Sequence, residues 1–388
     1  MAPRQTARQQ QDRETTRIEV RPRRLGLLVG GSGLIGGTIV HYFKKNVPGV
    51  ELMAPNSKKL SLREPEDIRR YCDKYQPDFI INTAIAAINS DAQLAYEVNY
   101  LGAIQLAEIA RKRNIPFIHV SSAAVMPPGH DLDESRRLPL TARMSNYAKS
   151  KLMAELTLEH MGRHGGLDYT ILRLAVVYGK HDHKIQGFHR LLFTIADRSM
   201  PVLLTSRGIC HSYSHSKKLP PLIHYLLNNR EEFSCQTYNF VDQKPVELAE
   251  LILTIRSYLD LPTPRRIFVP YPVAKTGRTV IFWILRKMSR IGIDARLPAE
   301  LMFMENFYQS QTLSPARLLN SSYRDPHAEV TVISALPELI EYYITRWQHF
   351  RLLSTFNEEF YRPDNGLEEF RQAPELLLEK IHRNRYTV

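Results

Sequence analysis

Cysteine is scarce in this sequence of 388 residues, which contains only Cys72, Cys210 and Cys235. No two of them stand in a C-x-x-C spacing, so the pattern excludes a disulfide framework and a cysteine-based zinc site, and it favours a reducing compartment. Long apolar runs are lacking as well, because no segment reaches the roughly 18 apolar residues needed to span a bilayer. These absences predict a cytoplasmic protein without a metal site.

Apolar side chains are almost absent from the first 23 residues, which are rich in Arg, Gln and Thr. This composition predicts a disordered basic tail over residues 1–23. The tail lacks the apolar segment of a signal peptide, and its three acids and missing amphipathic stripe argue against a transit peptide. The chain carries a net charge of +12 without a nucleic-acid-binding motif, so we expect anionic small molecules as partners and no nucleic acid.

What the sequence does contain is a glycine-rich segment between a strand and a helix. Leu25–Val29 predicts a buried strand and Thr38–Phe43 a helix, and Gly30, Gly33 and Gly36 lie between them. Glycine at this spacing allows a tight turn, close approach of a pyrophosphate and close helix–strand packing. The free N–H groups at the start of the helix would face the phosphates. The segment predicts a dinucleotide site, with a ligand-free glycine turn as the alternative.

No acid follows the second predicted strand, Val50–Ala54. Folds that prefer NAD usually carry an acid there, which binds the adenosine ribose hydroxyls. Asn56, Ser57 and Lys58 stand in its place and could instead neutralise a 2′-phosphate. We therefore expect NADP as the cofactor and keep NAD as a possibility. The alternative is a solvated turn with ordinary lysines.

Strands and helices alternate over the next 60 residues or so. Glu66–Lys74 and Ala92–Arg113 have helical spacing of apolar residues, whereas 77–84 and Pro116–Ser122 have the composition of buried strands. This rhythm predicts an α/β fold with a doubly wound parallel sheet covered on both faces.

A tyrosine and a lysine stand four residues apart further along the chain. Helical spacing puts Tyr147 and Lys151 on one face, directly before the apolar stretch Leu152–Leu158. A lysine ammonium beside a phenol favours the phenolate and lowers the tyrosine pKa from about 10. The tyrosine can then exchange a proton with a substrate oxygen while hydride moves to or from nicotinamide. Ser122, at the end of its strand, could hold that oxygen by a hydrogen bond.

Six motifs follow one another in a familiar order. They are GGSGLIGG at Gly30–Gly37, INTA at Ile81–Ala84, VNYLGAIQLAEIA at Val98–Ala110, HVSSAAVM at His119–Met126, YAKSK at Tyr147–Lys151 and LRLAVVYG at Leu172–Gly179. Together they resemble the extended short-chain dehydrogenase/reductases of the NAD-dependent epimerase/dehydratase superfamily. Within it, the chain looks most like the branch with dTDP-4-dehydrorhamnose reductase and UDP-glucose 4-epimerase. The resemblance covers about residues 24–260.

The resemblance implies a role for each matching residue. Ser122, Tyr147 and Lys151 would be catalytic, and Ser122, Met126, Arg173 and Tyr178 would face the substrate. The implied cofactor residues are Gly30, Ser32, Gly33, Leu34, Ile35, Gly36, Asn56, Ser57, Lys58, Ala84, Asn99, Tyr147 and Lys151.

The resemblance also implies the domain organisation. A Rossmann-type domain over residues 24–180 would be followed by a smaller substrate lobe over 181–330 that interleaves with it. Beyond residue 265 the resemblance weakens, and two amphipathic stretches predict a helical extension over 331–388. The helix Leu219–Leu227 belongs to the expected lobe, and helices over Glu338–Phe350 and Leu367–His382 to the extension. A homodimer of the kind common in the family is possible.

Two departures bear on the substrate. Met126, Pro127 and Pro128 replace an aromatic residue and its usual followers, and the stretch 207–216 lacks the acids of a Val-x-Asp-Asp signature. We expect hydride transfer on a carbonyl or secondary alcohol, with a nucleotide sugar as the first candidate. The apolar Val280–Leu285, which includes Trp283, favours instead a lipid or steroid-like alcohol, or a peripheral membrane contact. A third alternative is a non-catalytic NADP-binding scaffold.

Histidines gather between His181 and His224, but their spacing fits no standard ligand set. We expect ordinary loop histidines there, with a metal cluster as the alternative.

Overall fold

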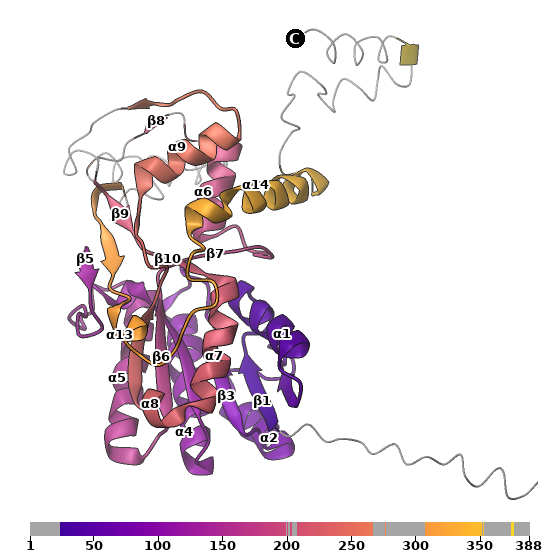
Figure 1. Cartoon of the computed structure of the whole chain (residues 1–388). Coiled ribbons are helices and arrows are strands. Elements are labelled where there is room, and N and C mark those ends of the chain that lie inside the picture. Colours follow the sequence, from indigo (N-terminus) through magenta and orange to yellow (C-terminus); the bar gives the residue numbers. More distant parts are fainter. Residues whose placement is uncertain are drawn as a thin grey trace, which may run out of the picture. The chain divides into compact units, whose positions relative to one another are not determined.

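A computed structural model describes residues 24–198, 200, 202–203, 208–266, 276, 307–350, 352 and 374–375 (Figure 1). The chain divides into two compact units, which we call the first and the second unit. The first unit comprises Met1–Val120, Leu140–Ile171 and Pro220–Gln236, and the second Ser121–Pro139, Leu172–Leu219 and Thr237–Val388. The basic tail 1–23, the apolar stretch Val280–Leu285 and the helix predicted over Leu367–His382 lie outside the described residues, apart from Pro374 and Glu375.

A six-stranded sheet in the order β11-β6-β4-β3-β1-β2 organises the fold. Its strands are β1 (Arg24–Val29), β2 (Val50–Met53), β3 (Phe79–Asn82), β4 (Phe117–Ser122), β6 (Tyr169–Leu174) and β11 (Gln236–Phe240). β1 pairs in parallel with both β2 and β3, and β3 pairs in parallel with β4. The chain reverses its direction of travel across the sheet between β1 and β3, the position where such sheets bind ligands. The expected α/β doubly wound fold is confirmed.

Helices pack against this sheet within the first unit (Figure 1). They are α1 (Leu34–Asn46), α2 (Pro65–Tyr75), α4 (Gly102–Arg113), α5 (Asn146–Gly165), α7 (Leu219–Asn228) and the short α8 (Arg230–Phe233). Their apolar faces and the strands enclose a core that includes Leu27, Ile68, Leu106 and Leu158, all fully buried. The sequence places α7 in the substrate lobe, whereas the structure groups its residues from Pro220 onward with the first unit.

The long helix predicted over Ala92–Arg113 is present but not uniform. It begins as a short α-helical turn, α3 (Ala92–Leu94), continues as a π-helix over Ala95–Leu101, and becomes α-helical again in α4. Asp91 accepts a hydrogen bond from the Leu94 backbone N–H and caps its start. Apolar spacing at a period near 3.6 does not distinguish an α-helix from one that contains a wider π turn, so the sequence could not predict it.

In its described residues, the second unit contains several short strands and three longer helices. β5 (Gly129–Leu132), β9 (Cys210–His211), β12 (Val246–Glu247) and β14 (Gln311–Leu313) form a sheet in the order β12-β9-β14-β5. β7 (Val176–Tyr178) pairs with β10 (Tyr213–His215), and β8 (Val202–Leu203) with β13 (Arg265–Arg266). The helices are α6 (Gly187–Ala196), α9 (Leu248–Tyr258) and α14 (Val332–His349), besides the four-residue α13 (Ala316–Leu319).

α14 begins earlier than the sequence indicates. The prediction starts at Glu338, whereas the helix starts at Val332 behind a capping box in which Thr331 and Ser334 bond to each other's backbone N–H. Its buried face, with Leu336, Tyr343 and Trp347, joins the core of the second unit. Within the described part of the chain, no helix combines the length and the apolar character that crossing a bilayer requires.

Candidate active site

Two of the three motif glycines are required by the fold itself. Gly30 leaves β1 with φ +95°, and a Cβ there would lie 2.7 Å from both the Ala84 backbone nitrogen and the Thr83 Oγ1. A Cβ on Gly36 would overlap the Gly30 carbonyl oxygen. Glycine at these two positions therefore lets the end of β1, the end of β3 and the first turn of α1 lie in contact.

Gly33 is different, because no contact among the described residues demands a glycine there. Its φ of −82° is open to any residue, and an added Cβ would meet only the Gly30 carbonyl oxygen at 3.5 Å, an ordinary contact. Gly33 is the N-cap of α1, where no side chain caps the helix and no acid lies in the first turn. This combination leaves a bare, positively polarised helix terminus, and it fits an anionic group that approaches the backbone at Gly33.

The residues after β2 form a tight turn at the surface. Asn56 Oδ1 accepts hydrogen bonds from the backbone N–H groups of Lys58 (3.1 Å) and Lys59 (3.2 Å). Asn56, Ser57 and both lysines are exposed. The turn therefore presents two ammonium groups and a hydroxyl at the carboxyl end of β2, in the place where an NAD-binding fold carries an acid.

Tyr147 and Lys151 lie one turn apart at the start of α5. Ser145 caps this helix by accepting a hydrogen bond from the Ala148 backbone N–H at 3.2 Å. Tyr147 is half-buried, whereas Lys151 is only 1% exposed and its Nζ donates to the Val120 carbonyl oxygen on β4 at 2.8 Å. Burial lowers the pKa of Lys151 to about 8, against a smaller opposing effect of Glu155. The lysine is thus held rigidly in a low-dielectric position beside the tyrosine's helix turn.

Asn99 connects this helix turn to the loop after β3. Its Oδ1 accepts from the Ala86 backbone N–H at 2.7 Å, and its Nδ2 donates to Ser150 Oγ at 3.1 Å. Ser150 Oγ in turn donates to the Tyr147 carbonyl oxygen at 3.0 Å. Asn99 therefore supports the backbone that carries Tyr147; its assignment as a cofactor residue stays a prediction.

One polar residue near this lysine was missed by the sequence reasoning. His119 is fully buried in β4, and its Nδ1 lies 3.4 Å from Asn82 Nδ2 on β3. Burial, and to a lesser extent the charge of Lys151, holds the pKa of His119 well below its ordinary value, so the imidazole is neutral. A histidine within the otherwise apolar Phe117–Val120 was the available signal.

The second unit contains Ser122, the last residue of β4, and Met126, which follows the strand. Ser122 Oγ accepts a hydrogen bond from the Ala124 backbone N–H at 3.2 Å and caps the 3₁₀ turn Ala123–Val125. Because that bond uses an oxygen lone pair, the hydroxyl hydrogen is left for another acceptor. Met126 is 2% exposed, so its side chain lies inside the second unit.

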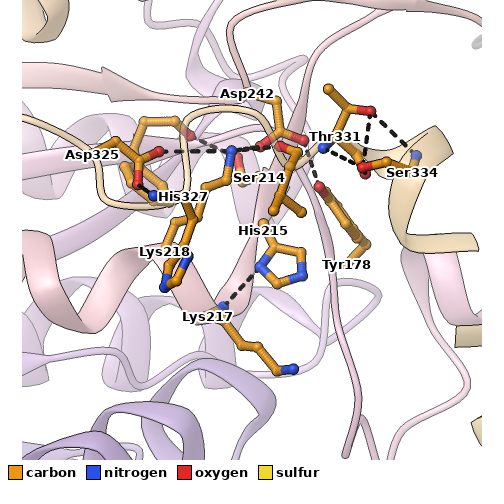
Figure 2. A network of polar contacts seen from close by, with 12 residues as sticks. Tyr178, Ser214, His215, Lys217, Lys218, Asp242, Asp325, His327, Thr331 and Ser334 are labelled. Carbon is orange, nitrogen blue, oxygen red and sulfur yellow. Dashed lines mark hydrogen bonds and ion pairs between the residues drawn. The ribbon is translucent and has the colours of Figure 1, made fainter. Parts of the chain in front are cut away.

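Arg173 and Tyr178 are both fully buried in the second unit. Arg173 Nη1 donates to the Glu134 carbonyl oxygen at 2.9 Å. Tyr178 donates its phenolic hydrogen to Asp242 Oδ2 at 2.6 Å (Figure 2). Burial, together with the Asp242 charge, raises the pKa of Tyr178 far above its ordinary value, which keeps the phenol protonated. These groups have partners within the chain, and their assignment to the substrate stays a prediction.

A buried lysine completes this network, which Figure 2 shows around Lys218. Lys218 Nζ lies 3.1 Å from Asp242 Oδ1 and 3.6 Å from Asp325 Oδ2, and it donates to the Val330 carbonyl oxygen at 2.5 Å. Lys218 and Asp242 side chains are only 3% and 2% exposed. Lys218 follows the stretch in which the sequence lacks the family's acids. The structure places a buried cation there, balanced by carboxylates from distant parts of the chain.

Side chains of α14 contact both the loop after β7 and the first turn of α6. Trp347 Nε1 donates to His189 Nε2 at 3.0 Å, and Tyr343 donates to the Gly179 carbonyl oxygen at 2.6 Å. Arg346 Nη2 lies 2.8 Å from His183 Nδ1. Among the residues that the structure describes, no three His, Cys, Asp or Glu side chains converge as a metal site would need.

The amino-acid sequence is similar to a known protein family and to individual proteins. Residues 27–208 match the NAD dependent epimerase/dehydratase family. The chain is 24% identical over 257 residues to the spore coat polysaccharide biosynthesis protein SpsK of Bacillus subtilis, spanning 62% of this chain and 86% of that protein. It is 28% identical over 178 residues to the decarboxylating sterol-4-alpha-carboxylate 3-dehydrogenase of Schizosaccharomyces pombe, which covers 41% of this chain and about half (52%) of that enzyme.

The fold is similar to that of a solved reductase. The dTDP-4-dehydrorhamnose reductase of Bacillus anthracis, solved in complex with NADP, superimposes with a TM-score of 0.57 at 16% identity, over 82% of this chain and 99% of the reductase. The family match over residues 27–208 and the similar fold agree with the resemblance to the extended short-chain dehydrogenase/reductases that the sequence motifs indicate.

Proposed function

We propose that this chain is an NAD(P)-dependent oxidoreductase that transfers hydride between nicotinamide and a carbonyl or secondary alcohol carbon. The observation that carries the proposal is the Tyr147–Lys151 pair on α5, in the same unit as a glycine loop whose middle glycine the fold does not require. The alternative of a non-catalytic scaffold gives no reason for a buried lysine one turn from a tyrosine.

The cofactor would be bound by the ends of β1, β2 and β3. Its pyrophosphate fits the uncapped start of α1 at Gly33, and a 2′-phosphate fits the exposed turn with Ser57 and Lys58. NADP is therefore the preferred cofactor. When bound, it supplies or accepts the hydride, and Lys151 would contact the nicotinamide ribose.

Proton transfer is assigned to Tyr147. Lys151 beside it favours the phenolate, and the Val120 carbonyl holds the ammonium in place. Ser122 would donate its remaining hydrogen to the substrate oxygen. Each of these groups acts on an oxygen that gains or loses negative charge during hydride transfer.

A nucleotide sugar is the proposed substrate. The dTDP-4-dehydrorhamnose reductase with a similar fold is named for a dTDP-linked sugar, and the positive net charge of this chain suits a substrate that carries a diphosphate. A sterol or other lipid alcohol is the second candidate, favoured by the similarity to the sterol dehydrogenase and by the apolar Val280–Leu285. A homodimer and a peripheral membrane contact are further parts of the proposal.

Calorimetric titration of NADPH and NADH tests the cofactor site first. NADPH should bind more tightly than NADH, Tyr147→Phe should leave the affinity nearly unchanged, and Gly33→Asp should abolish it through clash and charge at the pyrophosphate. If neither NADPH nor NADH binds, the proposal is wrong.

A second assay identifies the substrate class. NADPH oxidation is followed with dTDP-4-dehydrorhamnose, and NAD(P)⁺ reduction with a sterol alcohol in detergent. Turnover of either compound contradicts the scaffold alternative, and the compound that turns over decides between the two substrate classes.

A further inference from the structure

The loop that follows Ser122 cannot hold itself in place. Pro127 and Pro128 have no backbone N–H, so this part of the loop has few donors for its own carbonyl groups. Within the loop, the Met126 backbone N–H donates to the Ala123 carbonyl oxygen at 2.9 Å. The carbonyl groups of Met126 and Pro127 need donors from elsewhere in the chain.

A single amide side chain from far along the sequence supplies those donors. Gln311, the first residue of β14, places its Nε2 3.1 Å from the carbonyl oxygens of both Ala123 and Met126, and 3.3 Å from that of Pro127. The side chain is half-buried and belongs to the second unit, as does the loop. An amide nitrogen with two hydrogens thus lies among three acceptors.

The backbone around Gln311 holds the same loop at its far end. Gly129 donates its N–H to the Ser310 carbonyl oxygen at 2.8 Å, and β14 pairs with β5 so that Gln311 lies opposite Gly129. Both ends of the loop are therefore attached to residues 310 and 311. No other hydrogen bond from outside the loop reaches the Pro127 carbonyl in the described part of the chain.

Ser122 depends on this loop for its orientation. Its hydroxyl oxygen accepts a hydrogen bond from the Ala124 N–H. That N–H belongs to the same peptide group as the Ala123 carbonyl, which accepts from Gln311. A shift of the 3₁₀ turn would move that N–H and redirect the hydroxyl. Met126, the other predicted substrate residue of this loop, has its carbonyl on the same amide.

We propose that Gln311 is a positioning residue for hydride transfer: its amide holds the Ala123–Pro127 turn so that Ser122 presents its hydroxyl to the substrate oxygen. The inference rests on the proposed function, because it acts through Ser122. It also gives the unusual Met-Pro-Pro loop a source of donors, since Pro127 and Pro128 supply no N–H groups for the neighbouring carbonyl oxygens.

The test uses the full-length chain with Gln311→Glu, which keeps the size of the side chain but replaces the N–H donors by a carboxylate facing three carbonyl oxygens. Gln243→Glu is the matched control, because Gln243 is an exposed residue of the same unit. Gln311→Lys retains N–H donors and serves as the rescue variant.

Hydrogen exchange and kinetics are then compared at a temperature where every variant is folded. With Gln311→Glu, exchange of the Met126 and Gly129 amides should become faster, NADPH affinity should be unchanged, and kcat with dTDP-4-dehydrorhamnose should fall about ten- to a hundredfold, with a much smaller change in KM. Gln311→Lys should recover part of kcat.

Each other outcome is decisive. Unchanged exchange, or faster exchange with an unchanged kcat, overturns the positioning role. An equal loss of kcat with Gln243→Glu overturns it as well, since the charge alone would then be responsible. If the wild-type chain binds NADPH but turns over neither this sugar nor a sterol, the proposed function fails, and the exchange rates alone decide whether Gln311 holds the turn.

Discussion

The two units fix their functional groups in different ways. In the first unit, the end of β1, the start of α1 and the first turns of α5 place the glycine loop, Tyr147 and Lys151, so most of the geometry follows from local backbone structure. In the second unit, side chains reach backbone groups far away in the sequence, such as Gln311 to Ala123, 188 residues apart. Short sequence motifs therefore determine where Tyr147 and Lys151 lie, whereas contacts between distant residues determine the conformation of the loop after Ser122.

The largest expected effect comes from breaking the buried network of the second unit. Lys218→Met leaves Asp242 buried without its cation, so the free energy of unfolding should fall by about 3–5 kcal/mol. Urea denaturation measures it. Lys217→Met, which removes a neighbouring surface lysine, should change stability far less. Comparable losses in the two variants would show that the network contributes little.

The next largest effect concerns the first unit and is catalytic. Tyr147→Phe should lower kcat by roughly 10²-fold or more, the scale of a positioned acid–base group, and should leave the fold intact. Stopped-flow measurement of NADPH oxidation, with the compound that turns over in the substrate assay, gives kcat. Tyr258→Phe, at a tyrosine that is 52% exposed, is the control. A Tyr147→Phe enzyme with wild-type kcat would move the proton-transfer role to another residue.

A pH dependence of intermediate size should arise from the buried histidines of the second unit. Burial lowers the pKa of His189 to about 4, and the ordinary histidine pKa is about 6.5. Below pH 6.5 the unfolded state takes up a proton before the folded state does. Stability should therefore fall between about pH 6.5 and pH 4, by up to about 1.4 kcal/mol per pH unit for this histidine.

The measurement is the midpoint of urea unfolding at several pH values. His189→Gln should flatten the slope in part, because His215, whose pKa burial also lowers to about 4, and the buried His119 still contribute. His130→Gln, at an exposed histidine of the same unit, is the control. An identical slope in the wild type and His189→Gln would contradict the neutral, buried imidazole.

The smallest expected effect is a change in stability at Gly33, which is compared with the change at Gly36. Gly33→Asp adds an N-cap side chain to α1, so the chain without cofactor should gain about 0.5–1 kcal/mol of stability although it loses NADPH binding. Gly36→Ala should destabilise the chain instead, because its Cβ would overlap the Gly30 carbonyl. Thermal unfolding without nucleotide compares the two variants, and a destabilised Gly33→Asp would show that the fold does need this glycine.

The order of strands and helices in the first unit could be predicted from the sequence. Apolar runs and helical spacing predicted β1 and α2 closely, because these elements depend on nearby residues, whereas α5 extends well beyond the predicted Leu152–Leu158 at both ends. The same reasoning missed His119, which is paired across strands, and Gln311, which lies beyond the recognisable motifs. It also began α14 too late, because Thr331 and Ser334 cap the helix outside its regular apolar pattern. Pairings between distant residues leave no local pattern.

The π-helix over Ala95–Leu101 sets the orientation of the preceding chain relative to α4. If the same residues wound as an ordinary α-helix, everything before them would turn by about 100°. Asn99 could not then reach both the Ala86 N–H and Ser150, and the backbone of Tyr147 would lose that support. The wider π turn is therefore part of the support for Tyr147, and a change that restored regular α-helical winding would remove this support.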